Sequence, residues 1–265
     1  MIFPLFKRNI SSGIKVFMIL FAVICMYTTI IIYMYNPELS EMLSDYQKAL
    51  PGMMSAVGMT GIASNLLEWI QIYLYGFIMT LFPMVFAIIL GNKLVMNDIN
   101  QGSMANLLSS PYSRFRIILT QVISAVLLMF LLLAAVTAVG IASSRIMFPE
   151  ALDLSRYLQL NGSLFLLQLI ILGIVFFAAC LCSESRYYYS FGAGIPILFF
   201  LLQMLSNMGD KLENLKYATI FTLFPAKDIV QGIEGYWTSN AAMACIALAL
   251  FAAGIFRFCR RDLSL

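Results

Sequence analysis

The chain has 265 residues, of which 62% are apolar and only 11% are charged, and its formal net charge is +3. Ordinary soluble domains carry roughly 25% charged residues. A mean hydropathy of +0.90 is typical of an integral membrane protein. This composition excludes a soluble protein and a disordered one. The sequence contains no histidine, which excludes Ser-His and Cys-His nucleophile pairs, imidazole metal sites and histidine proton relays.

Six apolar stretches are long enough to cross a hydrocarbon core, which requires roughly 20 residues. They cover approximately residues 16–35, 70–91, 117–144, 162–182, 187–207 and 241–258. We therefore expect an all-α polytopic membrane protein, with six transmembrane helices in a single transmembrane domain that covers residues 1–265. The five cysteines lie within or at the ends of these stretches, so neither a disulfide framework nor a metal site is expected.

The connection between the first two spans carries a helical pattern. Its apolar side chains recur at the spacing of one helix face, at Leu39, Met42, Leu43, Tyr46, Ala49 and Leu50. This spacing predicts an amphipathic helix on the outer membrane surface, ended by Pro51 and Gly52. Such a helix would either gate an exit or shield the outer rim of the bundle, and the pattern is compatible with both.

The connection between the second and third spans, residues 92–116, contains turn residues and one short helical segment. Gly102 ends the turn that Asn97 or Asp98 can start, and Ser103 can cap a helix that runs through Leu108. Pro111 precedes the helix of the third span. A short helix parallel to the membrane, braced between two long spans, can transmit force from a cytoplasmic partner. A plain surface loop would carry the same turn residues.

A seventh apolar stretch, residues 217–224, is too short to cross a membrane and stops at Pro225. Backbone of this kind is tolerated at membrane depth only where protein buries it. We therefore expect a short re-entrant or interfacial segment over residues 217–235, before the last span.

Basic residues set the expected orientation. With both termini inside, the inner segments hold ten basic and three acidic residues, and the outer segments hold six basic and ten acidic residues. This asymmetry follows the positive-inside rule. We expect a multi-pass protein of the cell membrane with both termini in the cytoplasm.

Polar side chains inside the spans are amides and hydroxyls, and no charged residue lies deep in a predicted span. This pattern argues against a proton-driven or ion-coupled carrier. The glutamines that could line a substrate path are Gln71, Gln121, Gln168 and Gln203, although interhelical hydrogen bonds are the alternative use. Pro83 and Pro196 predict kinks in the second and fifth spans, either as hinges or as static bends.

Three segments resemble the permease subunits of type 2 ABC exporters. The run Gly-Ser-Met-Ala-Asn-Leu-Leu-Ser-Ser-Pro-Tyr-Ser-Arg at residues 102–114 resembles the family signature Gly-Thr-x-x-x-Leu-Leu-x-x-Pro-Val-Ser-Arg. The outer run at residues 43–51 looks like the family's loop between the first two spans, and residues 258–263 look like its closing Arg-Arg-Asp-Leu. Together with six spans in the same order, the resemblance covers essentially the whole chain.

The resemblance implies that residues 97–114 form a cytoplasmic coupling region that docks on an ATPase subunit. The coupling residues that it implies are Asp98, Gly102, Ser103, Leu107, Leu108, Pro111 and Arg114. Where the family usually carries acidic residues before the glycine, this chain has Asn100 and Gln101, so docking would depend more on shape and on Asp98. By position, Glu184 and Arg186 in the next inner turn could make a second contact or only anchor helix ends.

The chain has no Gly-x-x-x-x-Gly-Lys-Ser/Thr motif, so it has no phosphate-binding loop of its own. The resemblance then implies that ATP and Mg²⁺ bind to a separate cytosolic P-loop ATPase, present in two copies. It also implies a second permease copy or a paralogue. Membrane lipids are the other expected partners, and nucleic acid is not expected.

We therefore expect the permease subunit of an ATP-driven exporter and not an enzyme. Its cargo would be an amphipathic or hydrophobic peptide, lipid or drug. A non-transporting scaffold or immunity protein, which sequesters a membrane-active compound, would share the same spans and topology. A membrane enzyme is disfavoured, because Asp98, Glu184 and Asp262 fall in three separate inner segments with no metal-ligand spacing.

Overall fold

The computed structural model describes every residue except 37–50, 60, 62, 110, 209, 234 and 261–265. Within the described ranges the chain is helical and contains no strand. Its long α-helices are α1 (Phe3–Tyr33), α5 (Ile78–Gly91), α8 (Arg114–Met147), α9 (Leu154–Leu181), α11 (Gly194–Asn207) and α13 (Tyr236–Arg260). The amphipathic helix expected around residues 39–50 lies outside the described residues.

Shorter helical turns join or extend the long helices. The short α-helices are α3 (Pro51–Ala56), α4 (Leu66–Ile70), α6 (Asn97–Asn100), α7 (Ser103–Leu108), α10 (Ser185–Tyr188) and α12 (Ala226–Gln231). The π-helical turns are η1 (Gln71–Tyr75), η2 (Asn92–Met96) and η3 (Tyr189–Ala193), and the 3₁₀ segments are η4 (Asp210–Ala218) and η5 (Ile220–Leu223).

Six continuous helical segments of the described chain are long and apolar enough to cross a membrane, as the sequence predicts. Two of them include π turns: α5 continues through η2 and α6 to Asn100, and α10 and η3 lead into α11. The first helix begins at Phe3, well before the apolar run, with Pro4 in its first turn. The fourth begins at Leu154 rather than near residue 162, because the Asp153 side chain accepts a hydrogen bond from the Arg156 backbone N–H and caps it.

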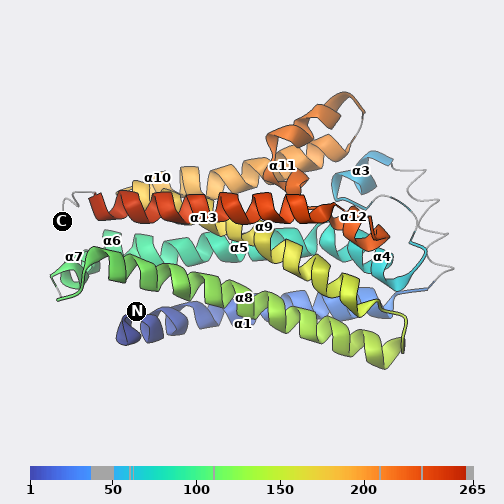
Figure 1. Cartoon of the computed structure of the whole chain (residues 1–265), viewed down its shortest axis with the longest axis horizontal. Helices are drawn as coiled ribbons and strands as arrows, with labels where there is room; N and C mark the ends of the chain where they lie inside the picture. The colour runs from blue at the N-terminus through green and yellow to red at the C-terminus, as the bar shows by residue number, and fades with distance from the viewer. Residues whose placement is uncertain are drawn as a thin grey trace.

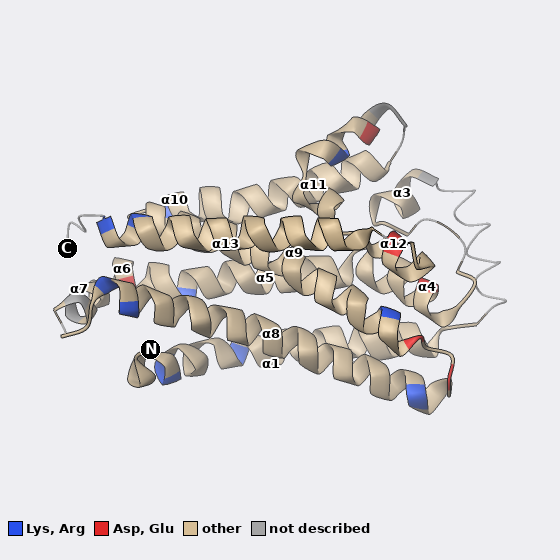
Figure 2. Ribbon diagram, in the orientation of Figure 1, with Lys and Arg blue, Asp and Glu red and all other residues tan. Residues whose placement is uncertain are grey.

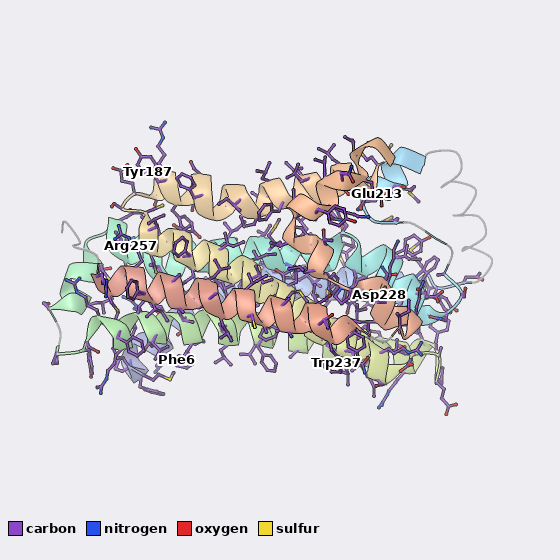
Figure 3. All side chains as sticks on the ribbon, turned by 45° about the horizontal axis from the view of Figure 1, so that its top comes forward. Phe6, Tyr187, Glu213, Asp228, Trp237 and Arg257 are labelled. Carbon is purple, nitrogen blue, oxygen red and sulfur yellow. The ribbon has the colours of Figure 1, made fainter. Side chains whose placement is uncertain are left out.

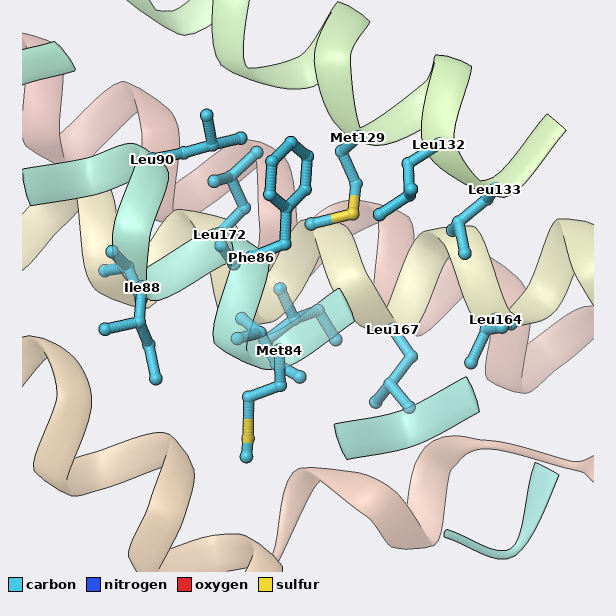
Figure 4. Packing of buried hydrophobic residues seen from close by; sticks show 14 of the residues in the cluster. Met84, Phe86, Ile88, Leu90, Met129, Leu132, Leu133, Leu164, Leu167 and Leu172 are labelled. Atoms are coloured by element: carbon cyan, nitrogen blue, oxygen red, sulfur yellow. The ribbon is translucent and has the colours of Figure 1, made fainter. Parts of the chain in front are cut away.

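The long helices form one bundle that buries its core between α1, α5, α8 and α9 (Figure 1). Helix α1 packs along α8, and α9 packs against both α5 and α13. Figure 4 shows aliphatic, methionine and phenylalanine side chains of α5, α8 and α9 meeting at the centre, among them Phe86, Met129 and Leu167. Phe86, Met129 and Leu167 have no solvent-accessible surface, and apolar contact of this kind fixes the helices relative to one another.

The segment between α11 and α13 consists of short turns and contains no span. Segment η4 lies against α11, and α12 lies against α9. Phe221, Ile229 and Val230 turn their side chains into the bundle and are buried. The helical turns match the short element expected over residues 217–235, while its depth in a membrane stays a prediction.

The two ends of the bundle differ in charge. In Figure 2, most of the blue ribbon positions, which mark Lys and Arg, lie at the end where α1 begins and α13 ends, beside α6, α7 and α10. Figure 3 labels Tyr187 and Arg257 at this end, and Glu213, Asp228 and Trp237 at the other. We refer to the first as the basic end; it holds both ends of the described chain (Figure 1).

Candidate functional site: the connection at the basic end

The predicted coupling region is a pair of short helices, α6 and α7, at the end of the second span. Gly102 separates them with a φ of +67°, a left-handed conformation that glycine adopts without steric cost. A Cβ at Gly102 would meet no atom within 4 Å. The need for glycine here therefore comes from the backbone turn and not from close packing.

Asp98 is the buried centre of this connection, with an exposed fraction of only 7%. Its carboxylate forms an ion pair with the Arg8 guanidinium of α1. It also accepts hydrogen bonds from the Ser103 hydroxyl of α7 at 2.9 Å and from the Gln121 amide of α8 at 3.4 Å. One carboxylate therefore joins α6 and α7 to the first and third spans, and it faces the interior of the protein rather than its exposed surface.

Further polar contacts hold the beginning of α1 against α8 and η2. The Ile2 backbone N–H donates to the Thr120 hydroxyl at 3.0 Å, and the Asn9 amide donates to the Ser124 hydroxyl at 3.3 Å. The Lys93 ammonium donates to the Ser12 carbonyl oxygen at 3.0 Å. The first segment of α1 is thus part of the same assembly as the coupling region.

The other predicted coupling residues divide between an inner and an outer face. Leu107 is partly buried and packs toward Ile2, Leu5 and Ile117. Gly102 and Pro111 are exposed, as is Gln101 between the two helices. The side chain of Leu108 lies outside the described part of the structure. Arg114, the first residue of α8, is half-buried, and the preceding Ser113 caps α8 by accepting from the Arg116 N–H at 3.4 Å.

The second predicted contact lies directly beside the first. Glu184, directly before α10, and Arg186, in its first turn, are both exposed. Between them, the Ser185 hydroxyl accepts a hydrogen bond from the Asn100 amide at the end of α6. The structure therefore brings together two connections that are far apart in sequence, with exposed residues of both at the basic end.

A buried tyrosine fixes the distance between the second and fifth spans near this end. The Tyr188 hydroxyl donates to the Ile88 carbonyl oxygen of α5 at 2.6 Å. Gly91 makes this approach possible, since a Cβ there would lie 2.6 Å from the Tyr188 hydroxyl and 2.3 Å from a Val175 methyl. The π turns η2 and η3 begin directly after these contacts.

The four candidate glutamines do not share one path. Gln121 donates to Asp98, and Gln168 donates to the Thr80 carbonyl oxygen at 3.1 Å. Both are fully buried, so their geometry is that of interhelical hydrogen bonds. Gln71 and Gln203 instead line a common cavity of about 370 Å³ at the end opposite to the basic end.

This cavity lies between the second span, the fifth span and the turns that precede α13. Aromatic side chains of Tyr75, Phe200 and Phe221 form part of its wall. Gln203 is held there by the Thr219 hydroxyl, which donates to its carbonyl oxygen at 3.0 Å. The cavity therefore combines hydrogen-bonding amides with an apolar surface.

Lys216 brings a positive charge to the same cavity. It donates to the Glu213 carboxylate at 2.5 Å. This hydrogen bond raises the pKa of the Lys216 ammonium and lowers the pKa of the Glu213 carboxyl. Both groups therefore stay charged over the neutral range.

Sequence reasoning missed Arg8, Tyr188 and Gly91. A buried Asp98 needs a cationic partner, but the sequence offers several basic residues and does not say which one is near. Gly91 is an isolated glycine inside a span, a signal that often marks close packing. Nothing in the sequence pairs it with Tyr188, which is distant in the chain.

Comparison with known proteins identifies the family of the chain. A family model described as ABC-2 family transporter protein matches residues 6–263, almost the entire chain. The chain belongs to the ABC-2 transporter family. No curated protein and no solved structure matches it. As an ABC-2 family member it is a multi-pass membrane protein and a permease component of an ABC transporter.

Proposed function

We propose that this ABC-2 family protein is the transmembrane permease subunit of an ATP-driven exporter. The single observation that carries the proposal is the shared position of α6, α7 and the turn before α10. Their exposed residues lie side by side at the basic end, and Asp98 ties this region to two spans. A partner that moves these turns would move α1 and α8 together with α5.

The energy for transport would come from a separate chain. Two copies of a cytosolic P-loop ATPase would bind ATP and Mg²⁺ and dock at the basic end, with both termini of the permease in the cytoplasm. A second permease copy or a paralogue would complete the translocation path. The basic side chains at this end support the orientation, because the positive-inside rule places them in the cytoplasm.

The cargo would be an amphipathic or hydrophobic molecule, such as a peptide, lipid or drug, moved outward. The cavity opposite the basic end supports this class, because Gln71 and Gln203 offer hydrogen bonds beside an aromatic wall. A scaffold or immunity protein that sequesters a membrane-active compound could use the same cavity. The tight linkage between the inner turns and the spans favours transport, since sequestration requires no such linkage.

A bulky substitution on the exposed face of the coupling region tests the proposal. Gln101→Trp and Glu184→Trp each place an indole on the surface where the ATPase would dock, without entering the core. We expect both variants to lose ATP-dependent transport, or ATPase stimulation by the permease, by about tenfold, while thermal stability stays unchanged. A tenfold loss corresponds to about 1.4 kcal/mol of docking energy.

Ser155→Trp is the matched control, because Ser155 is exposed at the opposite end of the bundle. It should retain transport and stimulation. Full activity of both Gln101→Trp and Glu184→Trp would contradict the assignment of this surface.

A further inference from the structure

A small apolar pocket lies at the basic end, between the first turns of α1, helix α7 and the start of α8. Its volume is about 280 Å³, and its lining is almost entirely apolar. The residues that line it are Ile2, Pro4, Leu5, Arg8, Leu107, Tyr112 and Ile117. Hydrocarbon, and not a polar ligand, suits such walls.

The walls of this pocket are held in place by contacts already described. Ile2 is fixed by its hydrogen bond to Thr120, and Arg8 by its ion pair with Asp98. Ile2, Leu5 and Ile117 form a buried cluster with Leu107 against it. The pocket is therefore a built feature of the junction between α1, α7 and α8.

Basic residues occur on the two long helices that form the pocket, α1 and α8. Arg8 lines it, and Lys7 beside Arg8 is exposed. Arg116 is exposed one turn before Thr120, on the side of α8 that binds the Ile2 backbone. Asp98 supplies negative charge nearby, but it is buried and paired with Arg8.

Aromatic side chains flank the same place and point away from the core. Phe3, Tyr112 and Phe115 have exposed fractions of 73%, 44% and 52%. Amphipathic and aromatic side chains at the end of a span are typical of the interface between hydrocarbon and headgroups. At the interface, an apolar pocket would lie where an acyl chain meets its phosphate.

We propose that this pocket binds one anionic phospholipid of the cytoplasmic leaflet. An acyl chain occupies the apolar pocket between α1 and α7, and the headgroup phosphate lies against Lys7, Arg8 and Arg116. Basic pockets between transmembrane helices on the cytoplasmic side are suited to acidic headgroups. A lipid seated here contacts the coupling region through Leu107, so it supports α7 from the membrane side.

The test measures lipid retention by the purified full chain. Protein is reconstituted in nanodiscs of either phosphatidylglycerol or phosphatidylcholine, extracted in mild detergent and analysed by native mass spectrometry. We expect one phosphatidylglycerol per chain to survive extraction, with phosphatidylcholine retained far less. Lys7→Gln and Arg116→Gln should each reduce phosphatidylglycerol retention about fivefold, as expected for the loss of one interfacial charge.

Arg257→Gln is the matched control, because it removes an exposed charge at the same end from α13, which contributes no residue to the pocket, whereas Lys7 and Arg116 lie on α1 and α8, which do. Leu107→Trp is the second probe, since the indole fills the pocket and leaves every charge in place. It should lower retention of phosphatidylglycerol even if a charge variant fails to fold. Size-exclusion profiles identify variants that unfold.

Equal retention of the two lipids would overturn the proposal, as would unchanged retention in Leu107→Trp or equal losses in Arg257→Gln and Arg116→Gln. A third result would also overturn it. If the pocket variants keep their lipid but lose a co-purifying ATPase, the pocket is a docking site for protein. This result would leave the proposed transport function intact.

Discussion

Asp98 is the residue on which the geometry of the inner connection depends. Burial removes its carboxylate from water, which is costly unless charge and hydrogen bonds replace the lost hydration. Arg8, Ser103 and Gln121 supply that replacement from α1, α7 and α8. This one side chain therefore links the predicted coupling region directly to two spans.

Replacing Asp98 with alanine should lower the stability of the purified protein by about 1–3 kcal/mol, because Arg8 and Gln121 lose their partner. This loss of stability is smaller than that expected on breaking a fully buried ion pair, since the Arg8 side chain is 46% exposed. Thermal unfolding monitored by intrinsic fluorescence measures the change. Glu184→Ala is the control, because this acid is exposed at the same end and its loss should change stability by less than about 0.5 kcal/mol.

An equal effect of Asp98→Ala and Glu184→Ala would contradict the central position of Asp98. The double variant Asp98→Ala with Arg8→Ala provides a further check. Its loss of unfolding free energy should be smaller than the sum of the losses in the two single variants, because each single change already removes the ion pair.

At the scale of helices, the contact between the second, fourth and fifth spans is so close that it tolerates no side chain at Gly91. Gly91 lets α5 approach Val175 of α9 and the hydroxyl of Tyr188. The π turn η2 follows Gly91 and carries the second span on to α6. Close packing and an irregular turn thus occur together where the span meets the coupling region.

Gly91→Ala should destabilise the protein by about 1–3 kcal/mol, because its Cβ collides with two side chains in a packed core. Gly162→Ala is the matched control in α9, where a Cβ meets no atom within 4 Å. Since alanine is the better helix former by about 1 kcal/mol, this variant should be neutral or more stable. Thermal unfolding of both variants measures these changes in stability. An unchanged stability of Gly91→Ala would contradict the close contact.

The sequence predicts the elements better than their contacts. Runs of about 20 apolar residues match the length of a transmembrane helix, which pairs its own backbone polar groups in lipid. Gly102 with Ser103 marks the break before α7. The extension of α1 to Phe3 was missed, because Lys7, Arg8 and Lys15 interrupt the apolar run there. Helix geometry places them on exposed positions while Leu5 and Gly13 face inward.

The candidate site is predicted only in part. The motif resemblance predicts a coupling region over residues 97–114, and its coupling role stays a prediction. It also assigns Asp98 to the docking surface, whereas the Asp98 side chain faces inward. The four glutamines look equivalent in sequence. Their separation into two internal hydrogen-bond donors and two cavity residues depends on how distant helices pack, which composition and spacing do not encode.

At the scale of the whole molecule, the separation of charge between the two ends predicts orientation. Lys and Arg are concentrated at the basic end, so by the positive-inside rule residues there should face the cytoplasm. Gln101→Cys and Ser155→Cys place thiols at opposite ends on exposed positions. In intact cells, a membrane-impermeant maleimide should label Ser155→Cys, and it should label Gln101→Cys only after permeabilisation.

The unsubstituted chain provides the background from its five native cysteines. Labelling of Gln101→Cys in intact cells, with protection of Ser155→Cys, would contradict this prediction and show the opposite orientation in the membrane. It would also place the coupling region on the side where no ATPase is available.

The most direct test of the transport assignment is purification of the tagged chain from its native membrane in mild detergent, followed by identification of its partners. We predict a stoichiometric P-loop ATPase that is lost when Gln101 or Glu184 is replaced by tryptophan and is retained with Ser155→Trp. A chain that purifies without any ATPase would contradict the account and favour a sequestering or scaffold role.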